Sequence, residues 1–398
     1  MKHYIICGNY GAGNLGDEAI LRGILYDLEN ISSGGKVTIF SGDPSATKVT
    51  YKDVPNLEVD SVAFMPSGIK SLFKFLSKKN RKGTIEALKK ADVFILGGGG
   101  LFTDDQTWKA VFIWFIQALA AKLYKKKIVI YGNSVGPLRS TLARILTRKA
   151  FLWAEKITVR DEESAKRLKK LGIEDGKVTI TADPALNISY LLERKSRKKE
   201  ILSEIQGEQI EEETEEKTDQ KKYAVISLRY LERTNKLYEK AVIDFINHLI
   251  SQNDYQVYLK PFGGGIISDQ EYLNKLIDQN ELDKNSVHVH KNNSLKETLD
   301  LIKGADFLLG MRLHSLIFAT LVGTPFIGLS YSEKVRNFAR SLNLEDFVLS
   351  LKETSTDTLL KTHGDLQKYE KHIKTHLVSE LATKKSLLDK NRKILQSV

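Results

Sequence analysis

The stretch Gly304-Ala-Asp-Phe-Leu-Leu-Gly-Met-Arg-Leu-His-Ser-Leu-Ile-Phe-Ala-Thr-Leu-Val-Gly-Thr-Pro-Phe-Ile-Gly-Leu-Ser-Tyr-Ser-Glu-Lys334 decides the fold. Phe307–Leu309 and Phe326–Leu329 are short apolar runs, and Leu316–Val322 has helix spacing and ends at a Gly-Thr-Pro stop. The pattern predicts a strand, a tight turn, a helix, a turn and a second strand. An α/β fold is therefore expected.

Three basic or titratable side chains interrupt these apolar runs. Arg312 and His314 lie at the predicted junction between strand and helix, and Lys334 follows the second strand. Ligands of open α/β sheets bind outside the carboxyl ends of the strands, which is where these residues are expected. A lone histidine here would more often cap or pack against its helix. The neighbouring arginine and lysine favour a functional role instead.

The bulk composition sets limits on the class of protein. With 398 residues, of which 41% are hydrophobic and 28% charged, the chain has apolar material for two α/β domains. The single Cys7 excludes an intramolecular disulfide and a thiolate metal cluster, and it is expected in the core. No signal peptide or membrane span is predicted, so a cytoplasmic location is expected. A net charge of +11 and a pI near 9.3 favour anionic partners without choosing among them.

Short β-rich runs alternate with helix-like runs along the chain, which indicates mostly parallel sheets. Residues 191–222 are highly charged and suit a connector between an amino-terminal domain at 1–190 and a second at 223–350, with helices at 351–398. The expected strands are Tyr4–Cys7, Val37–Phe40, Val93–Leu96, Ile128–Tyr131, Ile157–Val159, Val178–Ile180, Tyr223–Leu228, Tyr255–Leu259, Val287–Val289, Phe307–Leu309 and Phe326–Leu329. The expected helices of the first domain are Glu18–Leu28, Trp108–Leu123, Leu142–Trp153 and Glu163–Leu171.

A glycine motif, Gly11-Ala-Gly-Asn-Leu-Gly16, follows the first strand in the place of a dinucleotide-binding loop. The match is misleading, because Asp17 and Glu18 would repel a pyrophosphate at the helix start, and no ribose-binding acid follows about 20 residues later. Asn14 and Asp17 suit an N-cap and a first helical turn. The alternative for Asp17 is a general base.

Two more glycine-rich stretches, at 97–104 and 132–137, are predicted as turns whose N–H groups bind anions. Neither has the lysine of a P-loop, so hydrolysis of nucleoside triphosphates is not expected. Arg160 and Arg229 each follow a predicted strand and offer bidentate donors, although either could serve a surface ion pair. The scattered histidines predict no metal site.

Eight blocks in this order resemble the polysaccharide pyruvyl transferase family over roughly residues 3–340. They are Gly8-Asn-Tyr-Gly-Ala-Gly-Asn-Leu-Gly-Asp-Glu18, Gly97-Gly-Gly-Gly-Leu-Phe102, Tyr131-Gly-Asn-Ser-Val-Gly-Pro137, Val159-Arg-Asp-Glu-Glu-Ser164, Ala182-Asp-Pro184, Ser227-Leu-Arg229, Gly310-Met-Arg-Leu-His-Ser315 and Tyr331-Ser-Glu-Lys334. The resemblance implies a GT-B-like fold, with two Rossmann-like α/β domains facing a central cleft. The C-terminal helices are expected to close across the junction.

The resemblance also implies transfer of pyruvate from phosphoenolpyruvate to a sugar as a ketal. The amino-terminal domain is expected to take the saccharide acceptor, and the second domain the phosphoenolpyruvate. By family analogy His314 is the candidate acid and Asp17 the candidate base. The expected substrate-binding residues are Asn14, Arg160, Arg229, Arg312, Lys334, Gly98 and Gly99. No cofactor and no metal are expected.

Two other classes of function stay open. One is a GT-B-type glycosyltransferase that uses a nucleotide sugar, although no acid follows Lys334 until Glu345. The other is a non-catalytic anion-binding protein, suggested by charge alone. Nucleic acid is not an expected partner, because no aromatic residues interleave with a basic stripe. The acceptor sugar, its attachment to a lipid carrier and the oligomeric state are not predicted.

Residues 68–82 have the pattern of a basic amphipathic helix. Apolar residues from Ile69 to Leu76 lie within about two turns, and lysines and an arginine surround and follow them. A surface helix packed on its own domain would look the same. The functional alternative is peripheral contact with an anionic membrane at the inner face, near lipid-linked sugars.

Overall fold

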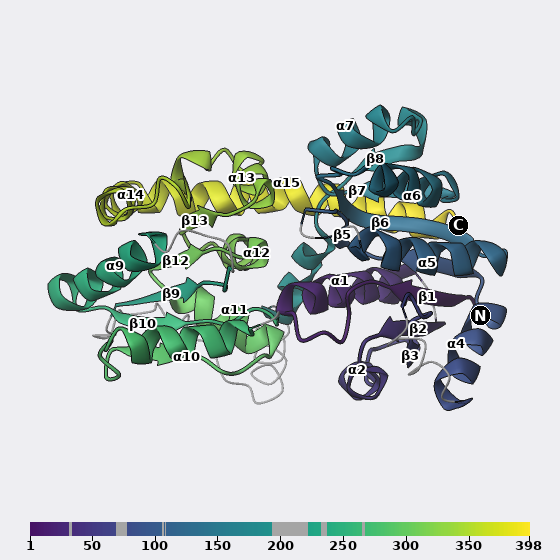
Figure 1. Ribbon diagram of the computed structural model, residues 1–398, viewed down its shortest axis with the longest axis horizontal. Coiled ribbons are helices and arrows are strands. Elements are labelled where there is room, and N and C mark those ends of the chain that lie inside the picture. Colours follow the sequence, from purple (N-terminus) through teal and green to yellow (C-terminus); the bar gives the residue numbers. More distant parts are fainter. Residues whose placement is uncertain are drawn as a thin grey trace, which may run out of the picture. The chain divides into compact units, whose positions relative to one another are not determined.

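The computed structural model describes residues 1–31, 34–68, 78–105, 107, 109–192, 222–231, 237–264 and 267–398 (Figure 1). The chain divides into two compact units. Unit 1 comprises Met1–Ile188 together with Thr383–Val398, and unit 2 comprises Ser189–Ala382. Each unit has a parallel sheet of its own.

Unit 1 is built on an eight-stranded sheet in the order β3-β2-β1-β4-β6-β7-β8, with β5 paired to β6. All its strand pairs are parallel. Its strands are β1 (His3–Cys7), β2 (Gly35–Ser41), β3 (Leu57–Ala63), β4 (Val93–Leu96), β5 (Gly99–Phe102), β6 (Lys127–Val135), β7 (Lys156–Val159) and β8 (Val178–Ile180). Its helices are α1 (Leu15–Ile31), α2 (Pro44–Tyr51), α4 (Lys78–Lys90), α5 (Lys109–Leu123), α6 (Thr141–Leu152) and α7 (Glu162–Lys170), with 3-10 turns at η1 (Asp175–Lys177) and η2 (Pro184–Ser189).

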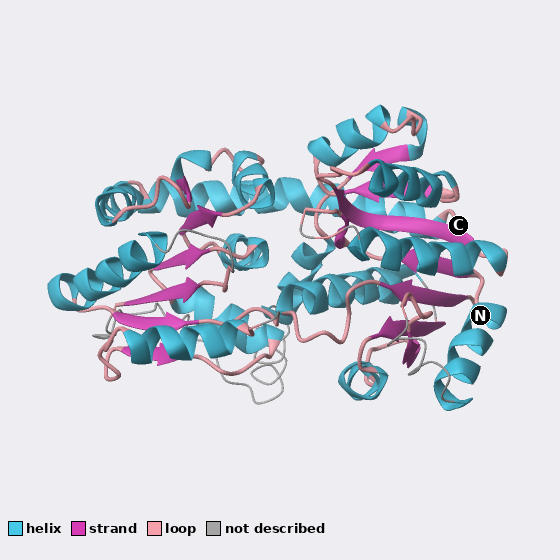
Figure 2. Ribbon diagram, viewed as in Figure 1, coloured by secondary structure: helices cyan, strands magenta, loops and turns pink. Residues whose placement is uncertain are grey.

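Unit 2 has a six-stranded parallel sheet in the order β11-β10-β9-β12-β13-β14, and a helix connects each strand to the next (Figure 2). Its strands are β9 (Tyr223–Ser227), β10 (Gln256–Leu259), β11 (Val287–Val289), β12 (Phe307–Gly310), β13 (Phe326–Ser330) and β14 (Val348–Ser350). Its helices are α9 (Leu237–Asn253), α10 (Asp269–Gln279), α11 (Leu295–Gly304), α12 (Leu313–Val322), α13 (Glu333–Arg340) and α14 (Thr356–Lys368), with η3 at Glu345–Phe347. Helix α15 (Glu370–Gln396) follows.

The predicted α/β class and both Rossmann-like units are confirmed. Every predicted strand overlaps an observed strand, and most agree with it to within one residue at each end. The exceptions are β2, which begins two residues earlier than predicted, and β6, which ends four residues later. The central strands β1 and β4 are wholly buried, as expected for parallel strands covered on both faces, and Cys7 lies among them. The expected C-terminal helices are also present, as α14 and α15.

The two glycine-rich stretches predicted as turns are partly strands, so that prediction is wrong in part. Gly99–Phe102 forms β5, and β6 continues through Gly132 to Val135. Gly132 has a φ of +59°, and a Cβ there would lie 2.6 Å from Cγ of Pro184. Glycine at this position therefore serves a close approach inside a kinked strand rather than a turn.

Some elements were not predicted from the sequence, among them β3, β14, α2 and α4. The expected amphipathic helix at 68–82 and the connector at 191–222 fall mostly outside the described residues. No helix in the described part of the chain combines the length and the apolar character needed to span a bilayer.

Candidate active site

The strand order of unit 2 fixes where a ligand is expected. From β9 the chain proceeds to β10 and β11 on one side, and from β12 to β13 and β14 on the other, so the order reverses between β9 and β12. The crevice outside the carboxyl ends of such a pair is the usual ligand site of doubly wound sheets. Gly310 of β12 pairs with Ser227 of β9. Arg312 and Arg229 each lie two residues beyond this pair.

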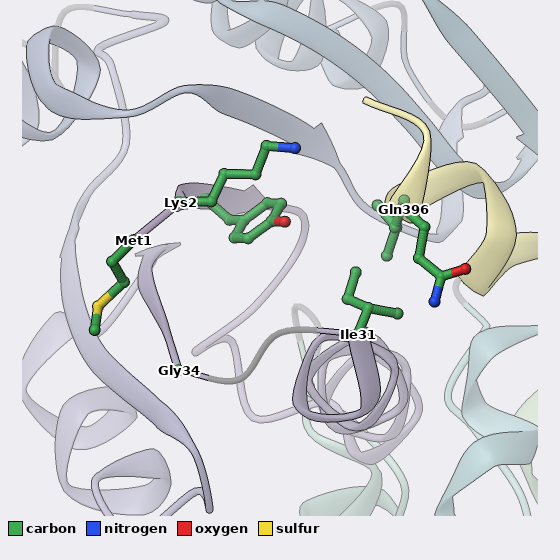
Figure 3. A pocket seen from close by; sticks show the side chains of 7 residues that line it. Met1, Lys2, Ile31, Gly34 and Gln396 are labelled. Atoms are coloured by element: carbon green, nitrogen blue, oxygen red, sulfur yellow. The ribbon is translucent and has the colours of Figure 1, made fainter.

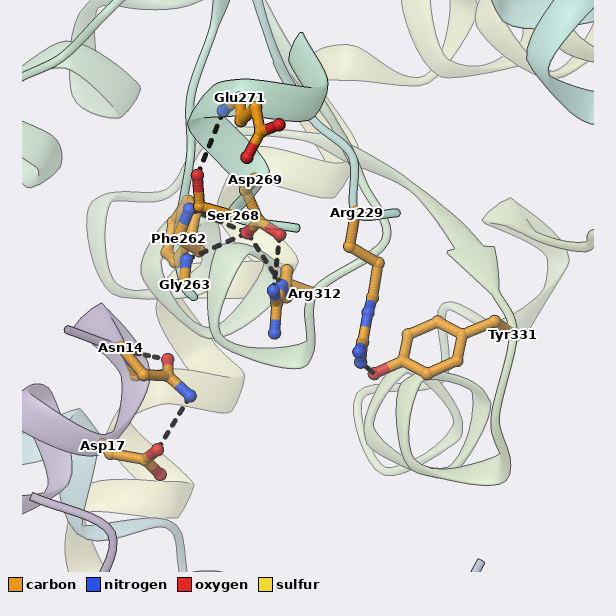
Figure 4. Close-up of polar contacts among 11 residues, drawn as sticks. Asn14, Asp17, Arg229, Phe262, Gly263, Ser268, Asp269, Glu271, Arg312 and Tyr331 are labelled. Atoms are coloured by element: carbon orange, nitrogen blue, oxygen red, sulfur yellow. Dashed lines mark hydrogen bonds and ion pairs between the residues drawn. The ribbon is translucent and has the colours of Figure 1, made fainter. Parts of the chain in front are cut away.

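Arg229 is oriented by a tyrosine that follows a different strand. Its Nη1 donates to the hydroxyl of Tyr331 at 2.8 Å, and its guanidinium lies 4.8 Å from the centre of the same ring (Figure 4). The buried Nε has no hydrogen-bond partner among the described residues. A guanidinium fixed by one contact with donors left over can bind an anion.

Arg312 is held by a buried carboxylate. Its Nε and Nη2 donate to the two oxygens of Asp269 at 3.0 and 2.5 Å (Figure 4). The side chain of Asp269 is 1% exposed and that of Arg312 is 14% exposed. Asp269 also accepts the backbone N–H groups of Phe262 and Gly263, at 3.2 and 2.9 Å. This pair occupies two of the five N–H groups of the guanidinium, so binding of an anion by the others stays a prediction.

His314 is the second residue of α12. Arg312 is the N-cap residue with extended backbone, and the helix begins at Leu313. Because the helix has begun, Arg312 and His314 do not face each other as they would along a strand. His314 is half-buried, and so is Lys334, which lies in the first turn of α13 directly after β13. The carboxyl edge of this one sheet thus carries Arg229, Arg312, His314 and Lys334.

A buried lysine at the same edge was missed in the sequence. Lys260 follows β10, is wholly buried, and donates from Nζ to the carbonyl of Asn292. Burial lowers the pKa of Lys260 to about 8, although the negative charge of Glu297 acts to raise it. The pKa of His290, which follows β11, is lowered by burial and by Lys260. The rule that located Arg229 would also have found Lys260, because it follows the predicted strand directly.

The carboxyl edge of the unit 1 sheet carries Asn14 and Asp17. Asn14 caps α1, since its Oδ1 accepts the N–H of Gly16 at 3.0 Å, which confirms the predicted N-cap. Its Nδ2 donates to Oδ2 of Asp17 at 2.7 Å (Figure 4), and Nδ2 of Asn9 donates to the same oxygen at 2.7 Å. Two amide groups therefore orient the carboxylate of Asp17.

The next acid, Glu18, occupies one backbone N–H group of the glycine loop. Its Oε1 accepts the N–H of Gly11 at 2.8 Å, and its Oε2 accepts the hydroxyl of Tyr51 at 2.8 Å. A dinucleotide loop offers its N–H groups to phosphate oxygens. This arrangement agrees with the expectation that Gly11–Gly16 does not bind a dinucleotide.

Gly98 and Gly99 follow β4, next to β1. A Cβ at Gly99, whose φ is +97°, would lie 3.5 Å from Oδ1 of Asp17, so this backbone is beside that carboxylate. A Cβ at Gly98 would lie 2.9 Å from Ile20 and 3.1 Å from a backbone oxygen. Gly98 is thus required by packing, and substrate binding by either glycine stays a prediction.

Arg160, by contrast, is built into the interior of unit 1. Its Nη1 forms an ion pair with Asp183, and its Nε donates to Ser134 at 2.6 Å. Both charged side chains are almost completely buried. The arginine therefore links the ends of β6 and β7 to the loop before η2. Substrate contact by Arg160 is a prediction that this geometry does not support.

A pocket of about 530 Å³ in unit 1 lies elsewhere (Figure 3). Its lining includes Met1, Lys2 and Tyr4 from the start of the chain and Leu395 and Gln396 from the end of α15. These residues lie at the amino end of β1, whereas Asn14 and Asp17 follow its carboxyl end. None of the predicted site residues lines this pocket.

Two parallel-sheet units, each with polar residues at the carboxyl ends of the strands, define the class of GT-B-like proteins. Solved structures share the fold. Among them are UDP-GlcNAc 2-epimerase from Methanocaldococcus jannaschii (TM-score 0.61, 15% identity, 92% of each chain), S. aureus MnaA with UDP (0.64, 12%, 96% of this chain and 91% of that one) and Anabaena Alr3699/HepE with UDP-glucose (0.60, 12%, 100% of each). At these identities the likeness concerns the fold alone.

The sequence gives the family. The chain belongs to the polysaccharide pyruvyl transferase family, whose model matches residues 14–333. It is also 25% identical over 396 residues to the amylovoran biosynthesis protein AmsJ of Erwinia amylovora, with 92% of each chain covered. The matched range includes Asp17, Arg229, Arg312 and His314.

Proposed function

We propose that this protein transfers a pyruvyl group from phosphoenolpyruvate to a sugar of a cell-envelope polysaccharide, or of its lipid-linked precursor, as a ketal. Family membership supports pyruvyl transfer in polysaccharide biosynthesis. The single structural observation that carries the choice of donor is the gathering of cationic groups at the switch point of unit 2. The proposed reaction needs no cofactor.

The chemistry of phosphoenolpyruvate matches that edge. The donor carries a phosphate and a carboxylate, and Arg229, Arg312 and Lys334 follow β9, β12 and β13. Guanidinium groups bind both kinds of anion by paired hydrogen bonds. Arg229 is the strongest candidate, because it is oriented by Tyr331 and its Nε has no partner within the described ranges.

The reaction needs one proton delivered and two removed. Protonation of the methylene carbon makes C2 electrophilic, two sugar hydroxyls add to C2, and phosphate leaves with the electrons of its C–O bond. One hydroxyl proton replaces the proton given to the methylene group, and the other leaves with phosphate. We assign the protonation to His314 at the start of α12.

The second role belongs to unit 1. Asp17 is a carboxylate oriented by Asn9 and Asn14 at the carboxyl edge of its sheet. A carboxylate that accepts a hydroxyl proton in the transition state typically contributes about 10²–10⁴-fold. We assign the deprotonation of the acceptor hydroxyls to Asp17. The reaction would take place in the cytoplasm, where phosphoenolpyruvate is made.

The test has two parts. Phosphoenolpyruvate should raise the melting temperature in a concentration-dependent way, and UDP-glucose should raise it much less. Incubation with phosphoenolpyruvate and a panel of free and lipid-linked oligosaccharides should release phosphate and add one pyruvate ketal to an acceptor by mass. A larger shift with UDP-glucose, together with release of UDP, would favour the glycosyltransferase.

A further inference from the structure

Helix α6 of unit 1 turns apolar side chains toward solvent. Leu142, Ile145 and Leu152 are 47%, 46% and 40% exposed, and these three residues form the α6 patch. Ile145 and Leu152 are seven residues apart, which is about two turns, so they lie on one face of the helix. The opposite side packs into the unit through Ala143, Thr147, Ala150 and Phe151. The helix is thus apolar toward the core and partly apolar toward solvent.

The neighbouring helix α5 also carries apolar side chains that are not fully buried. Helices α5 and α6 pack against each other, and both end at the edge of the sheet where the following strand begins (Figure 1). The rings of Phe115 and Trp153 lie 5.3 Å apart between them. Leu123, the last residue of α5, is also exposed.

The charges on α6 have one sign. The segment Arg139–Leu152 contains four cations and no aspartate or glutamate. Arg139 forms an ion pair with Asp105 at 2.6 Å. The other three cations of the segment are Arg144, Arg148 and Lys149. Nε of Arg148 donates to the carbonyl of Leu171 at 2.9 Å, and this neutral acceptor does not balance the charge of the guanidinium. Lys149 is exposed and lies between Ile145 and Leu152 along the helix.

We propose that the α6 patch docks unit 1 onto an anionic lipid surface, with Ile145 and Leu152 in the interface and Arg148 and Lys149 facing lipid phosphates. An exposed apolar face interleaved with cations is the pattern of interfacial helices. The patch is distinct from residues 68–82.

A second copy of the chain fits this surface less well. In a two-fold symmetric dimer the same surface meets itself. Such a dimer would place Arg148 and Lys149 close to their own copies and bury like charges. An anionic bilayer supplies the opposite charge as well as an apolar phase for the leucine and isoleucine side chains. The charge pattern therefore favours lipid over self-association.

Co-sedimentation with vesicles tests the proposal with the full chain. The parent should sediment with phosphatidylglycerol/phosphatidylcholine vesicles at low salt, but not with pure phosphatidylcholine. Lys149→Glu changes the charge by two units and should lower the ratio of bound to free protein roughly 25-fold, at about five-fold per charge. Ile145→Ser/Leu152→Ser should lose binding without loss of folding, because both positions are exposed.

Matched controls lie on α15, where Lys371 and Val378 are exposed. Lys371→Glu makes the same change in charge and Val378→Ser removes an exposed apolar group, and neither should alter sedimentation. Parent-like sedimentation of the α6 variants, or none of the parent with acidic vesicles, would overturn the proposal. The proposal would also be overturned if vesicle binding were lost only when Lys74, Lys78, Lys79 and Lys82 are changed to glutamine. A third contrary result would be a parent dimer that the α6 serine variant dissociates while that variant still binds vesicles. Vesicle binding requires no turnover, so it fails or succeeds independently of pyruvyl transfer.

Discussion

The carboxylate of Asp269 bonds the guanidinium of Arg312 through both oxygens, across 43 positions of sequence. The same carboxylate accepts the N–H groups of Phe262 and Gly263. One buried acid thus fixes both the loop after β10 and the arginine that precedes α12. Any role of Arg312 in binding an anion depends on this support.

Loss of that acid should destabilise the protein strongly. Asp269→Asn leaves the charge of Arg312 largely buried and uncompensated, which typically costs about 3–5 kcal/mol. Urea denaturation would measure the loss. The matched control is Asp278→Asn, which breaks the exposed pair between Asp278 and Lys284 in the same unit and should change stability little. Equal effects of the two substitutions would contradict a supporting role for Asp269.

His314→Gln should separate catalysis from binding. If His314 delivers the proton, turnover should fall about 10²-fold or more while phosphoenolpyruvate still raises the melting temperature. Phosphate release and thermal shift measure the two effects. The control is His372→Gln at an exposed position of α15. Turnover near the parent value would indicate that His314 only packs at the start of the helix.

Asn14 allows the helix cap to be separated from the support of Asp17. Asn14→Ser keeps a side-chain oxygen for the N–H of Gly16 but removes the amide that donates to Asp17. Stability should stay near the parent value while turnover falls. Asn14→Ala removes both functions and should cost about 0.5–2 kcal/mol in addition. Full turnover in the serine variant would argue that Asp17 needs only Asn9, or is not the base.

Asp27 should make unit 1 lose stability as the pH rises through about 6. Burial raises the pKa of Asp27 to about 6, although Tyr131, Arg392 and Asn187 donate to it. Because the folded pKa lies above the ordinary value, the folded state binds the proton more tightly between about pH 4 and 6. Its contribution is complete below about pH 4 and is lost as the pH rises through 6.

The comparison with Asp27→Asn isolates this effect. The difference in unfolding free energy between the two proteins should change by up to roughly 3 kcal/mol across that window. The parent should become less stable relative to the variant as the pH rises. Urea denaturation at several pH values measures it. Parallel curves for the two proteins would show that Asp27 titrates normally.

The sequence predicted well those features that depend on local pattern. The apolar runs at Phe307–Leu309 and Phe326–Leu329 predicted where two strands end. Strand ends of this kind predicted the edge of the sheet on which Arg229, Arg312 and Lys334 lie. Strand β5 was missed because its glycines resemble a turn, and because its pairing with β6 is a contact across the sheet. Propensity cannot reveal such a contact.

Contacts between residues that are distant in the sequence could not be predicted either. Arg160 could be placed after a strand, but not its ion pair with Asp183. Asp269 lies in the first turn of α10, and its bond to Arg312 depends on how β10 and β12 flank β9. These pairings decide which cations are committed to structure, and only the folded chain shows them.

Unit 1 is interrupted in sequence by all of unit 2, since it resumes at Thr383–Val398. In this segment Arg392 contacts Asp27, and the Val398 carbonyl accepts from Nζ of Lys2. Ribosomes synthesise the chain from its amino end, and domains generally fold as they emerge. Unit 2 therefore becomes complete first, although unit 1 begins first. Until the closing segment arrives, nascent unit 1 exposes the side of α1 that it will cover, and this interval is when a chaperone would be needed.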